Sequence, residues 1–474
     1  MDVEVLLENN RQLSQTGYDL AKCLIAQPQL QHLPFNKESE AIAPFMQGFK
    51  YKISPWPIII NQKLINDFDK QVRELPLIFN SVLKRALVEN KAATCKYLNI
   101  STLAADLYLN STIELNDILA RYDLIISDGL SKIIELNCGA SLGGWEPDFL
   151  VSEAFRAIEL LPDQRWNLKH RKVVVNLYKS YCQAVLRLKG AKAKGNFMIF
   201  VSRSNFSEQD IDNLQQYFRQ IYRQVRPEQF SQGELFFFYD EAQIEVDASG
   251  VLTYQGQVMD ALVASVEDEN DLSESVMTLL EAGALKDQYY FPSRIGLTLF
   301  ANKLLLAFVH EPQVLAKMTA NQQQLIKQHI PWATSLNREV VHWQGQEYSL
   351  ENFLETFKDQ LVIKKSRSMQ GRDVVVGKSS SLEQWRMFYR QYREDGDWLI
   401  QQYCEPDSVV HAEPELGLNQ YSMVWGIFSL QGRYSGGFIR AMVDDPQSKV
   451  INSACGACDF LLLEEQQQKL KLTI

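Results

Sequence analysis

The spacing of apolar residues predicts helices in the N-terminal part of the chain. Apolar positions recur every three or four residues in residues 1–30, where Pro28 breaks the pattern, and again in roughly residues 63–96. This is the period of an amphipathic helix. Between them, the proline-bounded segment 51–62 leads into an apolar run, which predicts a short strand.

A second region, from about residue 174 to 290, alternates predicted strands and helices. The polar stretch 161–172 separates it from the helical part. Such alternation is typical of a compact α/β unit with its own core. The expected elements are a strand at 197–201, a helix at 208–225, a strand at 235–239, a hairpin at 244–254, a strand at 261–266 and a helix near 271–284.

The pattern in the last third of the chain predicts a helix followed by a strand-rich region that contains a second helix. Residues 361–377 have the pattern of a strand, a short glycine-containing loop and a second strand. The other elements expected there are helices at 297–310 and 382–392 and strands at 398–406, 421–430 and 434–442. We therefore expect an α/β (α+β) fold in three regions, residues 1–172, 173–290 and 291–474.

The segment Arg121–Phe149 carries the clearest local signal. Two β-branched runs flank Asp128-Gly129, a dipeptide typical of hairpin turns. The expected loop is Asp128–Leu130, and it places apolar side chains together on one face. The expected facing pairs are Ser127 with Ser131, Ile125 with Ile133, Asp123 with Glu135 and Arg121 with Asn137, and the expected core face is Tyr122, Leu124, Ile126, Ile134 and Leu136.

The opposite face of this hairpin carries Arg121, Asp123, Glu135 and Asn137. Carboxylates directly opposite one another have Cβ atoms about 5 Å apart and repel unless a cation lies between them. Two acids and an amide carbonyl offer only oxygen ligands, which suit Mg²⁺. Asp123, Glu135 and Asn137 are therefore the predicted metal ligands. The alternative is a solvated outer face with Arg121 as counter-charge, and the spacing alone leaves both interpretations open.

Size and charge narrow the functional classes. A chain of 474 residues is expected to form two or three domains. The net charge of -10 argues against a nucleic-acid-binding surface, which needs an excess of Lys and Arg. With no run of about 18 apolar residues and no basic leader before an apolar one, we expect a cytoplasmic protein without membrane association. The seven cysteines show no disulfide framework and are expected to be reduced.

Four blocks follow one another at wide spacing. They are RYD with ELN and the loop ASLGG, ANKLLLAFVHE, VIKKSRSMQG followed by LIQQYCEP, and GGFIRA followed by INSACGA. In this order they resemble the circularly permuted ATP-grasp ligases, such as eukaryotic-type glutathione synthetase and glutathionylspermidine synthetase, over roughly residues 50–465. The resemblance implies a circularly permuted ATP-grasp fold with mixed or antiparallel sheets and an inserted α/β substrate or lid domain.

The resemblance also implies where ATP would bind. Lys303 and Lys364 would supply ammonium groups to the phosphates, with Mg²⁺ on the β and γ oxygens. The loop containing Gly371 would supply backbone N–H groups and close as a lid. The strand with Gln401, Gln402 and Tyr403 would contact adenine through its backbone. A lysine at a strand end is otherwise often a snorkelling edge residue.

The function implied by the resemblance is an ADP-forming carboxylate–amine ligase that makes an amide or peptide bond between small, amino acid-like molecules. A carboxylate would become an acyl phosphate, and an amine would then displace the phosphate. This route needs charge stabilisation and positioning rather than a protein nucleophile. Arg121 and Arg440 would hold the acid, since a guanidinium matches carboxylate and phosphate geometry, and Ser141 would complete the substrate pocket.

The chain departs from the glutathione synthetase pattern at several positions. That pattern has a further acid where this chain has Ser368, the loop after Asn137 is one residue shorter, and the lid has fewer glycines. These differences argue against glutathione as the product. Without an acid at position 368, the metal would be bound by the hairpin residues Asp123, Glu135 and Asn137.

Other functions stay open at this point. The rivals are an ATP-dependent small-molecule kinase and a catalytically silent ATP-grasp scaffold that binds a peptide or partner. The pair Cys455 and Cys458 is a weak metal or redox signal without a second pair, and the six histidines have no ligand spacing. The sequence does not fix the oligomeric state, and a homodimer is one option.

Overall fold

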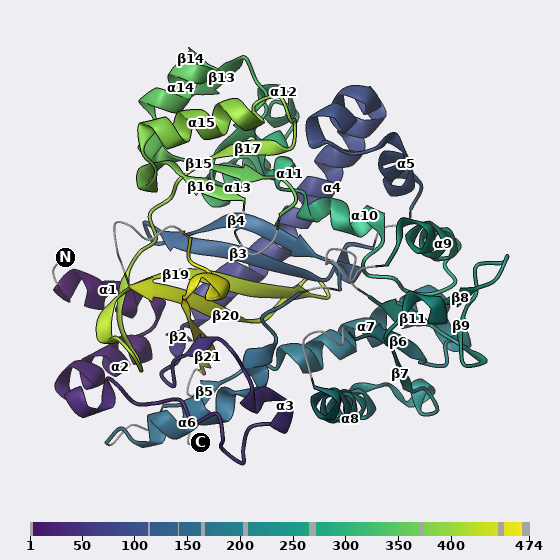
Figure 1. Cartoon of the computed structure of the whole chain (residues 1–474), viewed down its shortest axis with the longest axis horizontal. Coiled ribbons are helices and arrows are strands. Elements are labelled where there is room, and N and C mark those ends of the chain that lie inside the picture. The colour runs from purple at the N-terminus through teal and green to yellow at the C-terminus, as the bar shows by residue number, and fades with distance from the viewer. Residues whose placement is uncertain are drawn as a thin grey trace, which may run out of the picture.

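The computed structural model describes residues 3–111, 114–140, 142–162, 166–201, 207–264, 272–368, 371, 373–443 and 450–466. It is a mixed α and β fold with several sheets, as the expected α+β class requires. Figure 1 shows the largest sheet in the middle, a second sheet with its helices above it and a smaller α/β unit beside it. The division at residues 172 and 290 stays a prediction.

The central sheet has nine strands that come from both ends of the chain. Its main path runs β1 (Lys52–Ile53), β21 (Cys458–Glu465), β20 (Arg433–Val443), β19 (Gly417–Leu430), β3 (Ala120–Ser127) and β4 (Leu130–Cys138). The others are β18 (Val409–Glu413) beside β19, and β2 (Ile58–Ile60) and β5 (Leu168–Lys169) beside β21. Strand β19 pairs with β3, so the predicted hairpin lies directly against the last part of the chain.

One face of this sheet is covered by α4 (Gln62–Leu98), which agrees with the helix predicted at 63–96. Asn61 caps its first turn by accepting a hydrogen bond from the Leu64 backbone, which satisfies a free N–H group of the helix start. Buried residues recur at helical spacing along it. Phe68 among them packs against Trp425 and Tyr434 of the sheet, with ring centroids 6.1 and 5.8 Å apart.

The hairpin differs from the expected register in its distal half. Asp128 and Gly129 both have positive φ angles, so the turn has two residues and Ser127 pairs with Leu130. The pairing shifts by one between Leu124 and Asp123, which leaves Ile134 unpaired as a bulge. The expected pairs Ser127–Ser131 and Ile125–Ile133 are therefore wrong. The bulge restores the expected pairs Asp123–Glu135 and Arg121–Asn137.

The bulge also changes which isoleucine enters the core. Ile133 is fully buried in the main hydrophobic cluster, whereas Ile134 faces the cavity described below. Placing Ile134 on the core face was thus wrong, because a bulge turns the residues beyond it to the other face of the strand.

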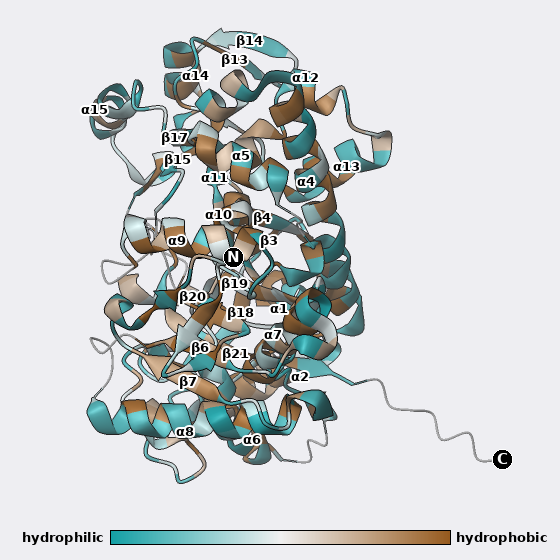
Figure 2. Ribbon diagram, turned by 90° about the vertical axis from the view of Figure 1, so that its right-hand side faces the viewer, coloured by the Kyte–Doolittle hydropathy of each residue, from teal (hydrophilic) through white to brown (hydrophobic). Residues whose placement is uncertain are grey.

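The α/β unit contains three parallel strands in the order β11 (Ala261–Val263), β6 (Phe197–Phe200) and β7 (Leu235–Phe238). The α/β alternation predicted there is confirmed, and helix α8 (Glu208–Val225) has the predicted bounds. Figure 2 shows hydrophilic positions dominating α8 on the surface, while its buried residues face inward. The remaining elements of this unit are α7 (Val173–Lys189), β8 (Glu245–Val246), β9 (Leu252–Tyr254), β10 (Gln257–Val258) and α9 (Glu274–Leu285).

The upper sheet is antiparallel, in the order β12 (Ala333–Ser335), β17 (Trp398–Gln402), β15 (Leu361–Lys365) and β16 (Val374–Val376). Its apolar face packs on α14 (Leu350–Thr356) and α15 (Leu382–Tyr392), where Trp385 is fully buried. The strand, loop and strand predicted at 361–377 are confirmed by β15 and β16. A hairpin of β13 (Val340–Trp343) and β14 (Gln346–Ser349) was not predicted.

The single helix expected at 297–310 is wrong. The segment divides into α10 (Ile295–Thr298), a 3-10 turn (Leu299–Ala301) and α11 (Lys303–Phe308). Asn302 causes the break: its backbone is extended, its side chain accepts from Leu304 N, and its amide donates to Leu98 O of α4. An asparagine side chain that bonds to nearby backbone groups in this way interrupts one helix and caps the start of the next. The cap sets Lys303 at the start of α11.

The remaining helices lie around the periphery. They are α1 (Val3–Leu13), α2 (Gln15–Ala26), α3 (Pro44–Gln47), α5 (Thr102–Asn110), α6 (Val151–Glu159), α12 (Pro312–Leu315) and α13 (Ala320–His329). Among the residues that the structure describes, no helix is both long and apolar enough to cross a lipid bilayer.

Candidate functional site

One cavity of about 1310 Å³ lies between the central sheet, the upper sheet and the α/β unit. Most of the predicted site residues line it, although they are distant in the sequence. They are Arg121, Asp123, Glu135, Asn137, Lys364, Gly371, Gln401, Gln402, Tyr403 and Arg440. Lys303 is not part of the lining but reaches Glu135, and Ser141 lies outside the described residues.

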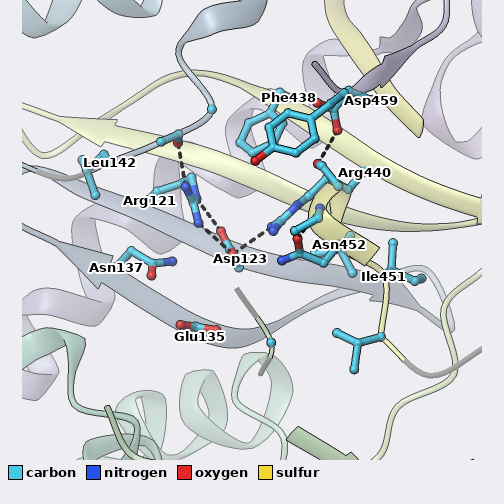
Figure 3. Close-up of a pocket in the computed structure, with 18 of the residues that line it drawn as sticks. Arg121, Asp123, Glu135, Asn137, Leu142, Phe438, Arg440, Ile451, Asn452 and Asp459 are labelled. Atoms are coloured by element: carbon cyan, nitrogen blue, oxygen red, sulfur yellow. Dashed lines mark hydrogen bonds and ion pairs between the residues drawn. The ribbon is translucent and has the colours of Figure 1, made fainter. Parts of the chain in front are cut away.

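Asp123 is the centre of a buried cluster of charges. Its side chain is 7% exposed, and Arg121 Nε donates to its Oδ1 at 2.7 Å while Arg121 Nη2 donates to Oδ2 at 3.1 Å. Arg440 Nη2 donates to the same Oδ2 at 2.8 Å. Figure 3 shows the carboxylate between the two guanidinium groups. One acid thus fixes the positions of both arginines predicted to hold substrate.

The glycine at position 426 makes room for this cluster. Gly426 pairs with Asp123 on one side and Phe438 on the other, and a Cβ atom there would lie 2.5 Å from the Phe438 ring. The ring therefore lies directly against the backbone of Gly426. The Cζ atoms of Arg121 and Arg440 lie 5.6 and 5.3 Å from its centroid, within the range of cation–π attraction.

The two arginines keep Asp123 ionised. Burial by itself would raise the pKa of Asp123, but the charges and hydrogen bonds of Arg121 and Arg440 outweigh burial and hold the pKa well below its ordinary value. Arg121 is therefore a counter-charge, as the alternative interpretation of the hairpin had it, but inside the protein rather than on a solvated face.

Two lysines lie around Glu135, the acid that faces Asp123. Lys303 Nζ is 2.9 Å from Glu135 Oε1 and also donates to Ser368 O at 2.9 Å. Lys364 Nζ donates to Gln401 Oε1 at 2.8 Å. Burial lowers the pKa of Lys364 to about 8, because the negative charge of Glu135 only partly offsets it. The two ammonium groups therefore approach Glu135 from α11 and from β15, and only that of Lys364 lines the cavity.

Three buried N–H donors in this cavity have no acceptor among the residues that the structure describes. They are Asn137 Nδ2, Gln401 Nε2 and Arg440 Nε. A buried donor without an acceptor costs about 1–3 kcal/mol, so such groups in a cavity indicate a ligand rich in oxygen acceptors. Carboxylates and phosphates are ligands of that kind.

The donor set around Glu135 fits Mg²⁺ in part. Glu135 is 26% exposed, with Oε1 paired to Lys303, and it lines the cavity with Asn137; a carboxylate and an amide carbonyl are ligands of the kind that Mg²⁺ prefers. Both oxygens of Asp123 already accept from guanidiniums. Within the described ranges no group of three His, Cys, Asp or Glu residues could hold a metal. The ligand set Asp123, Glu135 and Asn137 stays a prediction.

Two further acids in the cavity, Asp459 and Glu146, were not predicted from the sequence. Asp459 pairs with Arg440 across the β20–β21 ladder, and Ser453 Oγ donates to its Oδ1 at 2.6 Å. Burial, which outweighs Ser453 and Arg440, raises the pKa of Asp459 to about 7. Burial also raises the pKa of Glu146, although Gly144 N donates to it at 2.9 Å. The sequence signal that could have identified Asp459 is its position as an acid within the apolar run CDFLLL.

Gly144 and its neighbour Gly143 provide a first test of this geometry. Gly144 has φ +90°, and a Cβ there would lie 2.0 Å from the Phe438 ring. A Cβ on Gly143 would meet only Arg121 Nη1 at 3.8 Å. We expect Gly144→Ala to lower the free energy of unfolding by about 1–3 kcal/mol and Gly143→Ala to change it little. Denaturant unfolding measures both, and equal effects would contradict the placement of Phe438.

Comparisons with known proteins leave the family open. No family model matches the sequence, and no curated protein matches it. Among the solved structures that match is "Putative gamma-glutamylcysteine synthetase" from Methylobacillus flagellatus KT, with a TM-score of 0.38 and 9% sequence identity over 82% of this chain and 88% of that chain. A likeness at that level carries no argument about fold or function, so the functional conclusion rests on the cavity and the sequence blocks.

Proposed function

We propose that this protein is an ATP-dependent ligase that joins a carboxylate to an amine. The observation that carries the proposal is one cavity in which Lys364, and Glu135 with its ion pair to Lys303 behind the lining, adjoin two arginines clamped on Asp123. Separate cationic groups suit a triphosphate and an adjacent carboxylate. The order of the sequence blocks, which resembles the circularly permuted ATP-grasp ligases, supports the same function.

The proposed nucleotide site uses the upper sheet as one wall. Gln401 and Gln402 end β17, Tyr403 follows it, and all three line the cavity, where backbone groups would contact adenine. Gly371 would belong to a lid over the phosphates. A Cβ on Gly371 would lie 2.9 Å from Val450 Cγ1, so the proposed lid contacts the loop before β21. In a circularly permuted ATP-grasp fold the α/β unit would be the inserted domain.

The chemistry proposed has two balanced steps. A carboxylate oxygen of the acid forms a bond to the γ-phosphorus of ATP while the bond to the bridging oxygen breaks and ADP leaves. The amine nitrogen then bonds to the acyl carbon, the carbon–oxygen bond to phosphate breaks, and the nitrogen loses a proton. Arg121 and Arg440 orient the acid and stabilise developing charge. Mg²⁺, held by Glu135 and Asn137, would neutralise phosphate charge.

Two other functions make different demands on the same cavity. A kinase would transfer phosphate without an amine. A silent scaffold would bind a partner without consuming ATP, and it has no need for facing acids beside buried lysines. Arg440 Nε and Gln401 Nε2, both buried without acceptors in the described chain, favour a reactant with several oxygen acceptors over an apolar partner.

Incubation with ATP, Mg²⁺ and pooled carboxylic acids and amines separates the three functions. We expect ADP and phosphate to appear in equal amounts only when both an acid and an amine are present. Phosphate release that never depends on an amine would refute the ligase. An absence of ATP binding, measured by calorimetry with Mg²⁺, would refute both enzymatic functions.

The pKa of Lys364 gives the proposed ATP site a pH dependence. The lysine carries its positive charge below about pH 8 and loses it above, so ATP affinity should fall as the pH rises past that value, by up to about tenfold per pH unit. Calorimetric titration of ATP between about pH 6.5 and 9.5 measures this. Lys364→Met should flatten the profile, and a flat wild-type profile would contradict the role of Lys364.

A further inference from the structure

Two carboxylates lie at the end of the cavity away from the proposed phosphate site, with Arg440 in between. Asp459 is 3% exposed, and Figure 3 shows it on the opposite side of Arg440 from Glu135. Glu146 is half-buried on the loop that follows the hairpin. Both acids line the same cavity, and the charge of Glu146 contributes to the raised pKa of Asp459, so the two lie near one another. This end of the cavity plays no part in the steps proposed above.

Neither carboxylate has a cationic partner within hydrogen-bond distance among the described residues. Asp459 accepts from the Ser453 hydroxyl, and Glu146 accepts from the Gly144 backbone. Arg440 and Arg121 act on them only through space, because both guanidiniums are bound to Asp123. A buried carboxylate without a paired cation is costly. A buried Asp459 and a half-buried Glu146 in one cavity, neither with a paired cation among the described residues, indicate that a cation arrives with the ligand.

An independent observation identifies the other half of that ligand. Arg440 is 7% exposed, and its Nε has no acceptor in the part of the chain that the structure describes. Arg440 is also the ladder partner of Asp459. An unfilled donor on Arg440 beside an unpaired carboxylate on Asp459 matches a ligand that carries an anionic oxygen and a cationic nitrogen a few bonds apart.

We propose that Asp459 and Glu146 bind the ammonium group of an amino acid substrate whose carboxylate lies on Arg440. The inference deepens the proposed ligase function and rests on the same cavity. An ammonium group fits better than a metal ion, because Ser453 and the Gly144 backbone point donors at the two acids and the Arg440 charge is adjacent. Because Arg440 orients the acid in the proposed steps, the ammonium belongs to an acid substrate that is itself an amino acid.

Binding of free amino acids tests the site without the reaction. Each of the common amino acids, and its analogue without the amino group, would be titrated by calorimetry into wild type, Asp459→Asn and Glu415→Gln. Glu415 is an exposed acid outside the cavity lining and serves as the matched control. We expect at least one amino acid to bind wild type and Glu415→Gln alike. Asp459→Asn should bind it about 10- to 100-fold more weakly, and the analogue should bind wild type equally weakly.

Two results would overturn the proposal: no amino acid binds wild type, or Asp459→Asn binds it as wild type does. ATP affinity, which should be unchanged in Asp459→Asn, shows that the variant is folded. In steady-state kinetics Asp459→Asn should raise KM for the acid and leave KM for the amine unchanged. An amino acid that binds but never enters an ATP-dependent product would refute the ligase and leave the ammonium site standing.

Discussion

Replacing Asp123 by asparagine is expected to lower the free energy of unfolding by about 3–5 kcal/mol and to abolish turnover. The carboxylate holds Arg121 and Arg440 together within the sheet, and an amide would leave two adjacent guanidiniums without a counter-charge. Denaturant unfolding measures the loss. The folded pKa of Asp123 is depressed, so its contribution is present at neutral pH and is lost only as the pH falls below the ordinary carboxylate range.

The facing residue Glu135 is the matched control for this prediction. It occupies the same rung of the hairpin, but its side chain is partly exposed and contacts one lysine. Glu135→Gln should therefore cost less, about 1–2 kcal/mol of stability, because the glutamine oxygen still accepts from the buried Lys303 ammonium group, while still abolishing Mg²⁺-dependent turnover. Equal losses of stability in Asp123→Asn and Glu135→Gln would contradict the division between an acid that positions arginines and an acid that is open to a metal.

Replacing Lys364 by methionine is expected to lower kcat/KM about 10²- to 10³-fold without loss of stability. The ammonium group is buried beside Gln401 and is the group that we propose for the transferred phosphate. Burial disfavours the charged form of Lys364 in the folded protein, so removing that charge offsets the loss of its hydrogen bond to Gln401. Phosphate release and denaturant unfolding provide the two readouts.

Lys365→Met provides the control, because neighbouring residues on a strand point to opposite faces. Lys365 is adjacent in β15 but does not line the cavity. Its activity should match wild type. Equal activity losses in the two variants, or a strong loss of stability in Lys364→Met, would remove Lys364 from the proposed nucleotide site.

The elements that the sequence predicts well are those whose signals are local. The helices at α8 and α15 agree with prediction, because the apolar period fixes their extent. The hairpin shows where local reasoning stops. Asp128-Gly129 identifies the turn, but the turn is one residue shorter than expected, which shifts the pairing by one residue. The bulge at Ile134 shifts the pairing back again. The site pairs were therefore predicted correctly through a register that is wrong in its distal half.

The convergence of the site depends on long-range pairing, which hydrophobic periodicity does not encode. Gly426 brings β19 beside Asp123, and Arg440 then arrives from the next strand. Only the resemblance to a ligase family suggested that Lys364 and Arg440 belong with the hairpin. Asp459 was missed because β21 was not predicted as a strand. Without its pairing to β20, nothing in the sequence connects that acid to Arg440.

Trapping of an activated carboxylate tests the proposed ligase function most directly. Hydroxylamine is a small nucleophile that can replace the amine, so the protein would be incubated with ATP, Mg²⁺, hydroxylamine and pooled carboxylic acids, and the products analysed by mass spectrometry. We predict a hydroxamate of one acid, formed in step with ADP and formed about 10²- to 10³-fold more slowly by Lys364→Met. ATP consumption that yields a phosphorylated product and no hydroxamate would contradict the proposed ligase function.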